Sequence, residues 1–358
     1  MSQKLFTLGP VEMYEYTGVQ LPYFRTEEFS KIVLECAGRL KRLAGAPENA
    51  HVFLLTCSGT GAMEAVAAGC FNADDNLLVV DGGGFGHRFA LIAEHHEIPY
   101  DCVDVAFDHT LDPGTLDAAA EDKNFTGLLV NLHESTNGQL YDIDLLASFC
   151  RAHDMYFVID GIASFLADPF DFEEDGVDAL IISSQKALAL PPGLSIVIMS
   201  DRFYQKIQNQ NIKPFSMYFD FREAETDAVR GQTPFTPAIG TIIPLRERLE
   251  RIEDGGGSGA EIARVKELAE DFRARIASLI EAEKLALPKH PLSNACTPII
   301  FPNNNAKEVY TKLAKEHGVW LNPNGGALAD KVLRVGHLGN LTKDDNALLA
   351  GLLAEILT

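Results

Sequence analysis

The sequence predicts an α/β protein with a mainly parallel central sheet flanked by helices, followed by a smaller C-terminal α+β domain. Short apolar runs alternate with helical patterns between residues 30 and 200, which is typical of a parallel sheet that is buried on both faces. After residue 240 this alternation ends, and long helical patterns lead into two short apolar runs. We therefore expect a large α/β domain over residues 1–245 and a small domain over residues 246–358.

Each predicted strand of the large domain is an apolar run rich in Val, Ile and Leu. In chain order these runs lie at 51–56, 76–81, 127–132, 156–161, 179–184 and 194–199. Helical patterns occupy 28–44, 61–72, 86–97, 114–122 and 142–153. In the small domain we expect strands around 297–301 and 332–335, a final helix at about 343–356, and a break between two helical segments at the GGGSG run, 255–259.

The composition restricts the partners and the compartment. The chain has 358 residues and a net charge of −21, which argues against nucleic acid and anionic membranes as partners because both require basic patches. Its six cysteines include no CxxC pair, so we expect reduced thiols and no metal site. No apolar segment has the length of a signal-peptide core or of a membrane span. The expected compartment is the cytoplasm.

Two glycine-containing turns follow predicted strands. Ser58, Gly59 and Thr60 open a helix, where backbone N–H groups and two hydroxyls can bind a phosphate; the alternative is an ordinary capped turn. The second turn, 82–86, is Gly-Gly-Gly-Phe-Gly, and it lacks the last glycine of a dinucleotide fingerprint. Phe85 within it can stack on a planar ring or act as a simple apolar plug.

An acidic residue and a lysine end two further strands. Asp160 ends the run 156–160 and Lys186 follows the run 179–184, at the sheet edge where α/β folds bind ligands. An apolar neighbourhood lowers the pKa of a lysine, as an imine-forming amine requires. Alone, Asp160 could be a helix cap and Lys186 a surface lysine. Together with the phosphate-binding turn and Phe85, they form the set of groups that a pyridoxal phosphate enzyme needs.

At this point the sequence resembles the class V aminotransferases of PLP fold type I, in the serine–pyruvate and alanine–glyoxylate branch. The resemblance covers essentially the whole chain. Its most specific segment is SSQKALALPPG (183–193), with an aspartate 26 residues before the lysine, from 160 to 186. The other matching segments are LGP (8–10), SGTGAMEA (58–65), GGFGHR (83–88), HESTNG (133–138), DGIAS (160–164), TPFTP (233–237) and KVLRVG (331–336).

The resemblance implies a role for each residue at the cofactor. Lys186 would carry pyridoxal 5'-phosphate as a Schiff base and move the proton between substrate and cofactor. Asp160 would pair with the ring nitrogen, and Phe85 would stack on the ring. The remaining cofactor contacts implied are Ser58, Gly59, Thr60 and Gln185 at the phosphate, and Ser135 or Thr136, Ile162 and Ser164 around the ring.

The resemblance also implies a substrate pocket and a dimer. Arg334 would bind the substrate carboxylate through its planar guanidinium, and Gly9 would line the pocket from the N-terminal segment 1–20. Thr236, or Thr233 in the alternative register, would reach the phosphate of a neighbouring subunit, so we expect a homodimer with active sites at the interface. Arg25, His133 and His337 receive no role from the sequence; Arg25 is a candidate for a second anionic group.

The reaction that we expect is amino-group transfer from a small amino acid, such as alanine or serine, to pyruvate or glyoxylate. The main alternative is a 2-aminoethylphosphonate–pyruvate transaminase, a type of enzyme that shares the N-terminal and SGTGAMEA segments. A cysteine desulfurase-like lyase is disfavoured by Gln185, where those enzymes have His, and by the absence of Cys from the loop 322–330. A non-catalytic protein of the same fold is disfavoured because Asp160 and Lys186 are both present.

Overall fold

The structure, a computed structural model, describes residues 4–8, 11–14, 21–209 and 214–357. Its main sheet has seven strands in the order β2-β10-β9-β8-β5-β3-β4. Strand β10 pairs antiparallel with β2 and β9, and the remaining pairs are parallel. The strands are β2 (His51–Leu55), β3 (Leu77–Asp81), β4 (Tyr100–Asp104), β5 (Gly127–Asn131), β8 (Tyr156–Asp160), β9 (Ala179–Ser183) and β10 (Ser195–Met199). The carboxyl ends of β2, β5, β8 and β9 therefore lie at one edge of the sheet.

Strand β4 was not predicted from the sequence. It forms one border of the sheet, where it pairs only with β3. Most of its residues are partly or fully exposed, including Asp101 and Asp104. An edge strand that is half-solvated does not form an apolar run, so the pattern that marks the buried strands is absent.

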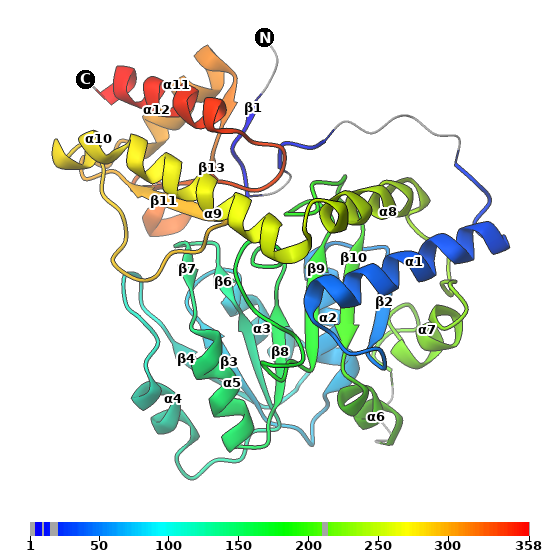
Figure 1. The fold of residues 1–358 in the computed structure, drawn as a ribbon. Coiled ribbons are helices and arrows are strands. Elements are labelled where there is room, and N and C mark those ends of the chain that lie inside the picture. The colour runs from blue at the N-terminus through cyan, green and yellow to red at the C-terminus, as the bar shows by residue number, and fades with distance from the viewer. Residues whose placement is uncertain (1–3, 9–10, 15–20, 210–213, 358) are drawn as a thin grey trace.

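Helices cover both faces of the large sheet. Along β2, the alternate residues Val52 and Leu54 pack into one apolar cluster, and Phe53 and Leu55 pack into the other. The first cluster is covered by α1 (Glu27–Ala44), α4 (Pro113–Ala120), α5 (Ile143–Ala152) and α8 (Ile239–Asp254). The second is covered by α2 (Gly59–Cys70), α3 (Gly86–His95), α6 (Asp201–Asn209) and α7 (Phe221–Ala228). The result is a three-layer α/β arrangement, as expected (Figure 1).

The C-terminal part of the chain builds a separate apolar cluster. Its sheet has the order β11-β14-β13, and the N-terminal strand β1 (Lys4–Leu5) pairs with β12 in the same region (Figure 1). Its strands and 3-10 turn are β11 (Cys296–Ile300), β12 (Val319–Trp320), β13 (Asn322–Pro323), β14 (Val332–Gly336) and η1 (Gly326–Leu328). Its helices are α9 (Gly257–Arg275), α10 (Ala277–Glu281), α11 (Ala306–His317) and α12 (Lys343–Leu357).

The predicted break between two helical segments is confirmed. Helix α8 ends at Asp254 and α9 begins at Gly257. Gly256 between them has a φ of 107°, a left-handed conformation that glycine adopts without steric cost. The division of the chain near residue 245 stays a prediction; that residue lies inside α8. None of the described helices is long and apolar enough to cross a bilayer.

Candidate active site

A cavity of about 240 Å³ opens at the carboxyl edge of the large sheet. It lies where β2, β5, β8 and β9 end, and most of the residues predicted from the sequence line it. The lining residues are Ser58, Gly59, Thr60, Phe85, Arg88, Asn131, Ser135, Asp160, Ile162, Ala163, Gln185 and Lys186. Residues that are up to 128 positions apart in the chain, from 58 to 186, therefore meet in one pocket.

The first side of the cavity is the start of helix α2. Ser58 is the N-cap of this helix, and its Oγ accepts a hydrogen bond from the Gly61 backbone N–H at 3.3 Å. A Cβ on Gly59 would come within 2.4 Å of the end of the Ile162 side chain, so the turn packs closely against the loop after β8. A helix N-terminus with hydroxyl groups beside it is a favourable place for an anion.

Asp160 lies at the end of β8 and is buried. Its carboxylate accepts hydrogen bonds from Asn131 Nδ2 at 2.8 Å and from the Ile162 backbone N–H at 2.9 Å. Burial raises the pKa of Asp160 to about 6, although both hydrogen bonds act in the opposite direction. The carboxyl group is thus ionised at neutral pH and fixed in orientation, as is required to pair with a cationic ring nitrogen.

Lys186 follows β9 on a tight turn. The turn is closed by the Ala189 backbone N–H, which donates to the Lys186 carbonyl at 2.8 Å, and Ala189 itself has a positive φ of 54°. Burial of the amine lowers the pKa of Lys186 to about 8, and the nearby positive charges of Arg334 and Arg88 also lower it. Within the described part of the chain, no carboxylate lies within ion-pair distance of Lys186. Its amine is therefore available as a nucleophile near neutral pH.

Phe85 is held by a network that the sequence did not reveal. The buried Glu134 accepts hydrogen bonds from the backbone N–H groups of Gly86 and Thr136, both at 2.8 Å. Thr136 Oγ1 in turn accepts one from the Gly84 N–H at 3.0 Å. These bonds join the glycine turn to the segment after β5 and fix Phe85 at the cavity wall.

This set of groups fits pyridoxal phosphate. The cavity offers one amine with a lowered pKa, one buried carboxylate, an aromatic side chain and a helix N-terminus that favours an anion. These correspond to the aldehyde, the ring nitrogen, the ring face and the phosphate of that cofactor.

Comparison with known proteins decides the family. The sequence profile described as aminotransferase class-V matches residues 17–339. The chain belongs to the class-V aminotransferases. It is therefore a PLP-dependent enzyme of fold type I, and pyridoxal 5'-phosphate is its cofactor.

Individual relatives agree with this assignment along most of the chain. An L-aspartate–glyoxylate aminotransferase of Paracoccus denitrificans is 26% identical over 349 residues, which cover 94% of this chain and 87% of the relative. A 2-aminoethylphosphonate–pyruvate transaminase of Vibrio vulnificus is 28% identical over 331 residues, covering 91% and 89%. Among solved structures, an alanine–glyoxylate aminotransferase of Nostoc sp. superposes with a TM-score of 0.91 at 24% identity, covering 100% and 96%.

Arg334 of this aminotransferase lies on β14, outside the lining of the cavity but in contact with it. Its Nη1 donates to the carbonyl of Ser135, a lining residue, at 3.0 Å, and its Nη2 donates to the Pro323 carbonyl at 2.8 Å. Its Nε is buried and has no hydrogen-bond partner among the described residues. Two backbone carbonyls therefore fix the plane of the guanidinium and leave further N–H donors available.

The other predicted residues do not line the cavity or lie outside the described part of the chain. Thr136 does not line the cavity, because its hydroxyl holds the glycine turn as described above. Thr236 is exposed and lies on a different loop. Gly9 falls outside the described residues.

His133 and His337 are fully buried. Burial lowers the pKa of each to about 3, so both are neutral at physiological pH.

Three functional candidates escaped sequence reasoning. Asn131 and Arg88 line the cavity, and Glu134 supports its wall. Asn131 is the polar last residue of the buried strand β5, which is the signal that had identified Asp160. Arg88 donates to Thr60 Oγ1 at 3.1 Å and lies 4.9 Å above the centroid of the Phe85 ring; no local pattern distinguishes it from a surface arginine.

Proposed function

We propose that this class-V aminotransferase moves an amino group from a small amino acid, alanine or serine, to pyruvate or glyoxylate. The observation that carries the proposal is the presence of Lys186 and Asp160 in one cavity, with a lowered pKa for the amine and a buried carboxylate. The names of the relatives support the acceptors, since glyoxylate and pyruvate appear in them. The choice of a small donor is supported by Arg334, whose guanidinium adjoins the cavity through Ser135 and can bind one carboxylate.

Lys186 and Asp160 would be the catalytic residues. Bound pyridoxal phosphate supplies an aldehyde that takes up the amino group and a ring that accepts electrons from the substrate Cα–H bond. Lys186 Nζ would hold the cofactor and then remove and return the Cα proton, for which an amine with a pKa near the working pH is suited. Asp160 would keep a proton on the ring nitrogen, and Asn131 would keep the Asp160 carboxylate in position.

Residues around the cavity would hold the cofactor. Ser58, Gly59, Thr60 and Gln185 would bind its phosphate at the start of α2, where the helix dipole favours a negative charge. Phe85 would lie on one face of the ring and Ile162 near the other, which excludes water from the reacting atoms. Ser135 rather than Thr136 would lie beside the ring hydroxyl, because Ser135 lines the cavity and Thr136 does not.

Substrate and subunit contacts complete the proposal. Arg334 would bind the substrate carboxylate with the N–H groups that its two carbonyl partners leave available. Gly9 would leave room for a small side chain in the pocket. Thr236 would contact the cofactor phosphate of the partner subunit, so the active enzyme would be a homodimer with its active sites at the interface.

Initial rates with a panel of donors test the proposed reaction. Alanine, serine, aspartate and 2-aminoethylphosphonate are each combined with pyruvate and with glyoxylate, and kcat/KM is compared, with Lys186→Ala as the inactive control. We expect alanine or serine to give the highest value. A preference for 2-aminoethylphosphonate would instead establish the alternative that the Vibrio vulnificus relative suggests, and a preference for aspartate would contradict the proposed donor.

A further inference from the structure

We propose that Arg25 and Gln232 form a clamp that positions the loop 233–236, so that Thr236 is presented in a fixed place to the cofactor phosphate of the partner subunit. The inference rests on the role of Thr236 in the proposed function and adds two positioning residues to it. The sequence alone makes Arg25 a candidate for binding a second anionic group. The contacts of its guanidinium point to the loop instead.

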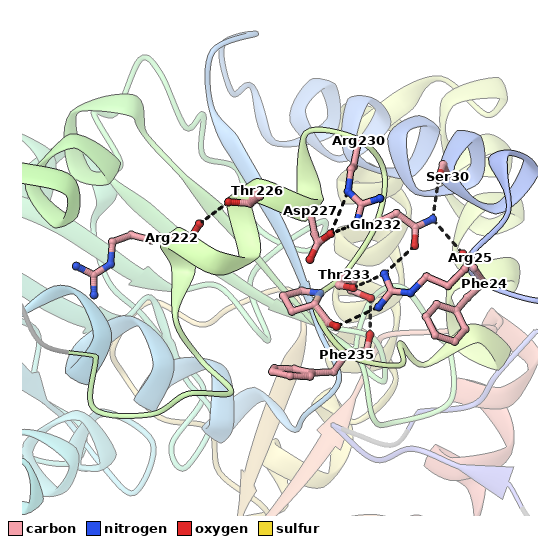
Figure 2. Close-up of polar contacts among 11 residues, drawn as sticks. Phe24, Arg25, Ser30, Arg222, Thr226, Asp227, Arg230, Gln232, Thr233 and Phe235 are labelled. Carbon is pink, nitrogen blue, oxygen red and sulfur yellow. Dashed lines mark hydrogen bonds and ion pairs between the residues drawn. The ribbon is translucent and has the colours of Figure 1, made fainter.

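The guanidinium of Arg25 is hydrogen-bonded to the loop 233–236 and to Gln232 before it (Figure 2). Its Nη1 donates to the carbonyl of Thr233 at 2.9 Å and to Gln232 Oε1 at 3.1 Å, and its Nη2 donates to the carbonyl of Pro234 at 3.0 Å. The guanidinium also lies 4.7 Å above the centroid of the Phe24 ring. A planar guanidinium bonded to two consecutive carbonyls defines the direction of the backbone there, which a lysine ammonium could not do.

Gln232 connects the clamp to helix α1 and to the segment before it. It is buried, and its Nε2 donates to the Phe24 carbonyl at 3.0 Å and to Ser30 Oγ at 2.7 Å on helix α1. Its amide therefore connects the segment before α1, α1 itself and the loop. The preceding Gly231 has a φ of 72°, and a Cβ there would come within 2.3 Å of the Ser30 carbonyl, so only glycine permits this close approach.

The far end of the loop is fixed as well. The Ala238 backbone N–H donates to Thr56 Oγ1 at 3.0 Å, and Thr56 lies two positions before the phosphate-binding Ser58. The Phe235 ring stacks on Tyr218 with centroids 5.0 Å apart. The Thr233 hydroxyl donates back to the Phe235 carbonyl at 2.7 Å, so it is already used inside the loop. Thr236 between these anchors is exposed and is the threonine left to reach outward.

Holding the loop in advance would tighten cofactor binding. A loop that must be ordered when the phosphate arrives loses conformational entropy at that moment, and this loss is subtracted from the affinity. The clamp removes that cost before binding. Its effect should therefore pass through Thr236 and vanish when the Thr236 hydroxyl is absent.

The test is a double-mutant cycle on the equilibrium dissociation constant for pyridoxal phosphate, measured by the absorbance of the bound cofactor. We expect Thr236→Val and Arg25→Met each to weaken binding about tenfold, the scale of one hydrogen bond to a charged group. The double variant should bind no more weakly than Thr236→Val alone. Arg25→Lys should resemble Arg25→Met. Arg230→Met is the matched control, because this exposed arginine pairs with Asp227 and not with the loop.

The outcomes separate this inference from the proposed function. If Thr236→Val binds the cofactor normally, Thr236 does not contact the phosphate. The proposed contact is then wrong, and so is the clamp that depends on it. If Thr236→Val weakens cofactor binding but Arg25→Met and Arg25→Lys do not, the clamp is wrong while the contact of Thr236 stands. The same holds if the double variant shows the product of the two single losses in affinity. Thermal unfolding of each apoprotein identifies a variant that fails to fold; should Arg25→Met do so, Arg25→Lys decides.

Mixing two subunits that carry different substitutions tests whether the contact is made across the interface. A subunit carrying Lys186→Ala supplies an intact clamp and Thr236, and a subunit carrying Arg25→Met and Thr236→Val supplies an intact Lys186. If the loop serves the partner, the mixed dimer binds covalently attached cofactor with wild-type affinity at one of its two sites. If affinity stays at the level of the weakened subunit, the loop serves its own chain and the proposed presentation to the partner is wrong.

Discussion

Two lysines near the seven-stranded sheet, Lys206 and Lys186, each have an aspartate nearby, and they differ in how completely their amines are bonded. Lys206 on α6 donates to Asp75 Oδ2 at 2.9 Å and to the Cys70 carbonyl at 2.8 Å, and it lies 4.7 Å above the centroid of the Phe71 ring. Lys186 has no carboxylate within ion-pair distance among the described residues, and its pKa is lowered to about 8.

The comparison distinguishes a lysine whose amine is bonded within the fold from a lysine whose amine is suited to react. When a lysine is paired with a buried carboxylate, removing one partner leaves an unpaired buried charge, which destabilises the fold. A buried ammonium that lacks such partners shifts towards the neutral amine, which is the nucleophilic form. The same residue type thus forms an ion pair in one region and is proposed to supply the chemistry in the other.

Removing Lys186 should give the largest effect on activity among these tests of the comparison. We expect Lys186→Ala to lower kcat/KM by at least roughly 10³-fold, because both the cofactor attachment and the proton transfer are lost. The free energy of unfolding of the apoprotein should stay the same or rise, since a poorly solvated ammonium is removed. Steady-state kinetics and urea denaturation measure the two effects. A large loss of stability would mean that Lys186 is a structural residue like Lys206.

Removing Lys206 should have the opposite profile. Lys206→Met leaves the Asp75 carboxylate buried without its cation, which we expect to lower the free energy of unfolding by about 3–5 kcal/mol. At a temperature where the variant is folded, kcat should be close to that of the wild type. Replacing both partners, Lys206→Met with Asp75→Leu, should restore much of the stability because no unpaired charge remains. Failure of the double variant to recover would indicate that other contacts of these residues dominate.

The variant Asp160→Asn tests how burial affects the stability of a carboxylate in the same cavity as Lys186. The folded pKa of Asp160, about 6, lies above its usual value, so stability that is present when the group is protonated is lost as the pH rises through about 6. At pH 7.5 the neutral amide should therefore stabilise the apoprotein by up to about 3 kcal/mol.

The same substitution should slow transamination by roughly 10²-fold or more, because the amide cannot hold a proton on the ring nitrogen. The cofactor should remain bound. Thermal unfolding as a function of pH and single-turnover kinetics give the two readouts. Near-normal turnover would show that another residue faces the ring nitrogen.

The pH dependence of cofactor uptake is the mildest of these effects. Only the neutral amine of Lys186 can attack the cofactor aldehyde. Its pKa of about 8 predicts that the rate of reconstitution of the apoprotein rises with pH up to about 8 and then levels off. An ordinary lysine would give a rise that continues towards pH 10. Stopped-flow absorbance at saturating cofactor distinguishes the two profiles.

Much of the fold and of the candidate site could be predicted because the informative residues carry a local pattern. Ser58, Asp160 and Lys186 each follow an apolar strand, so their common location at one sheet edge follows from the topology of a parallel sheet. The residues that the sequence did not reveal depend on distant partners. Glu134 binds the Gly86 N–H 48 positions away. Arg25 was a candidate in the sequence, but its partner, the Thr233 carbonyl, lies 208 positions away.

Such contacts are determined by tertiary packing, and no spacing in the sequence indicates them. The edge strand β4 was missed for a related reason, because its exposed face interrupts the apolar run.

The central claim is that Lys186 is the residue that carries the cofactor. Borohydride reduction of the cofactor-loaded protein fixes the cofactor to the amine that holds it, and peptide mapping by mass spectrometry then locates that amine. We expect the label on the peptide that contains Lys186 and none on the peptide that contains Lys206. A label on any other lysine, or wild-type loading of the Lys186→Ala variant with a reducible bond, would contradict the account.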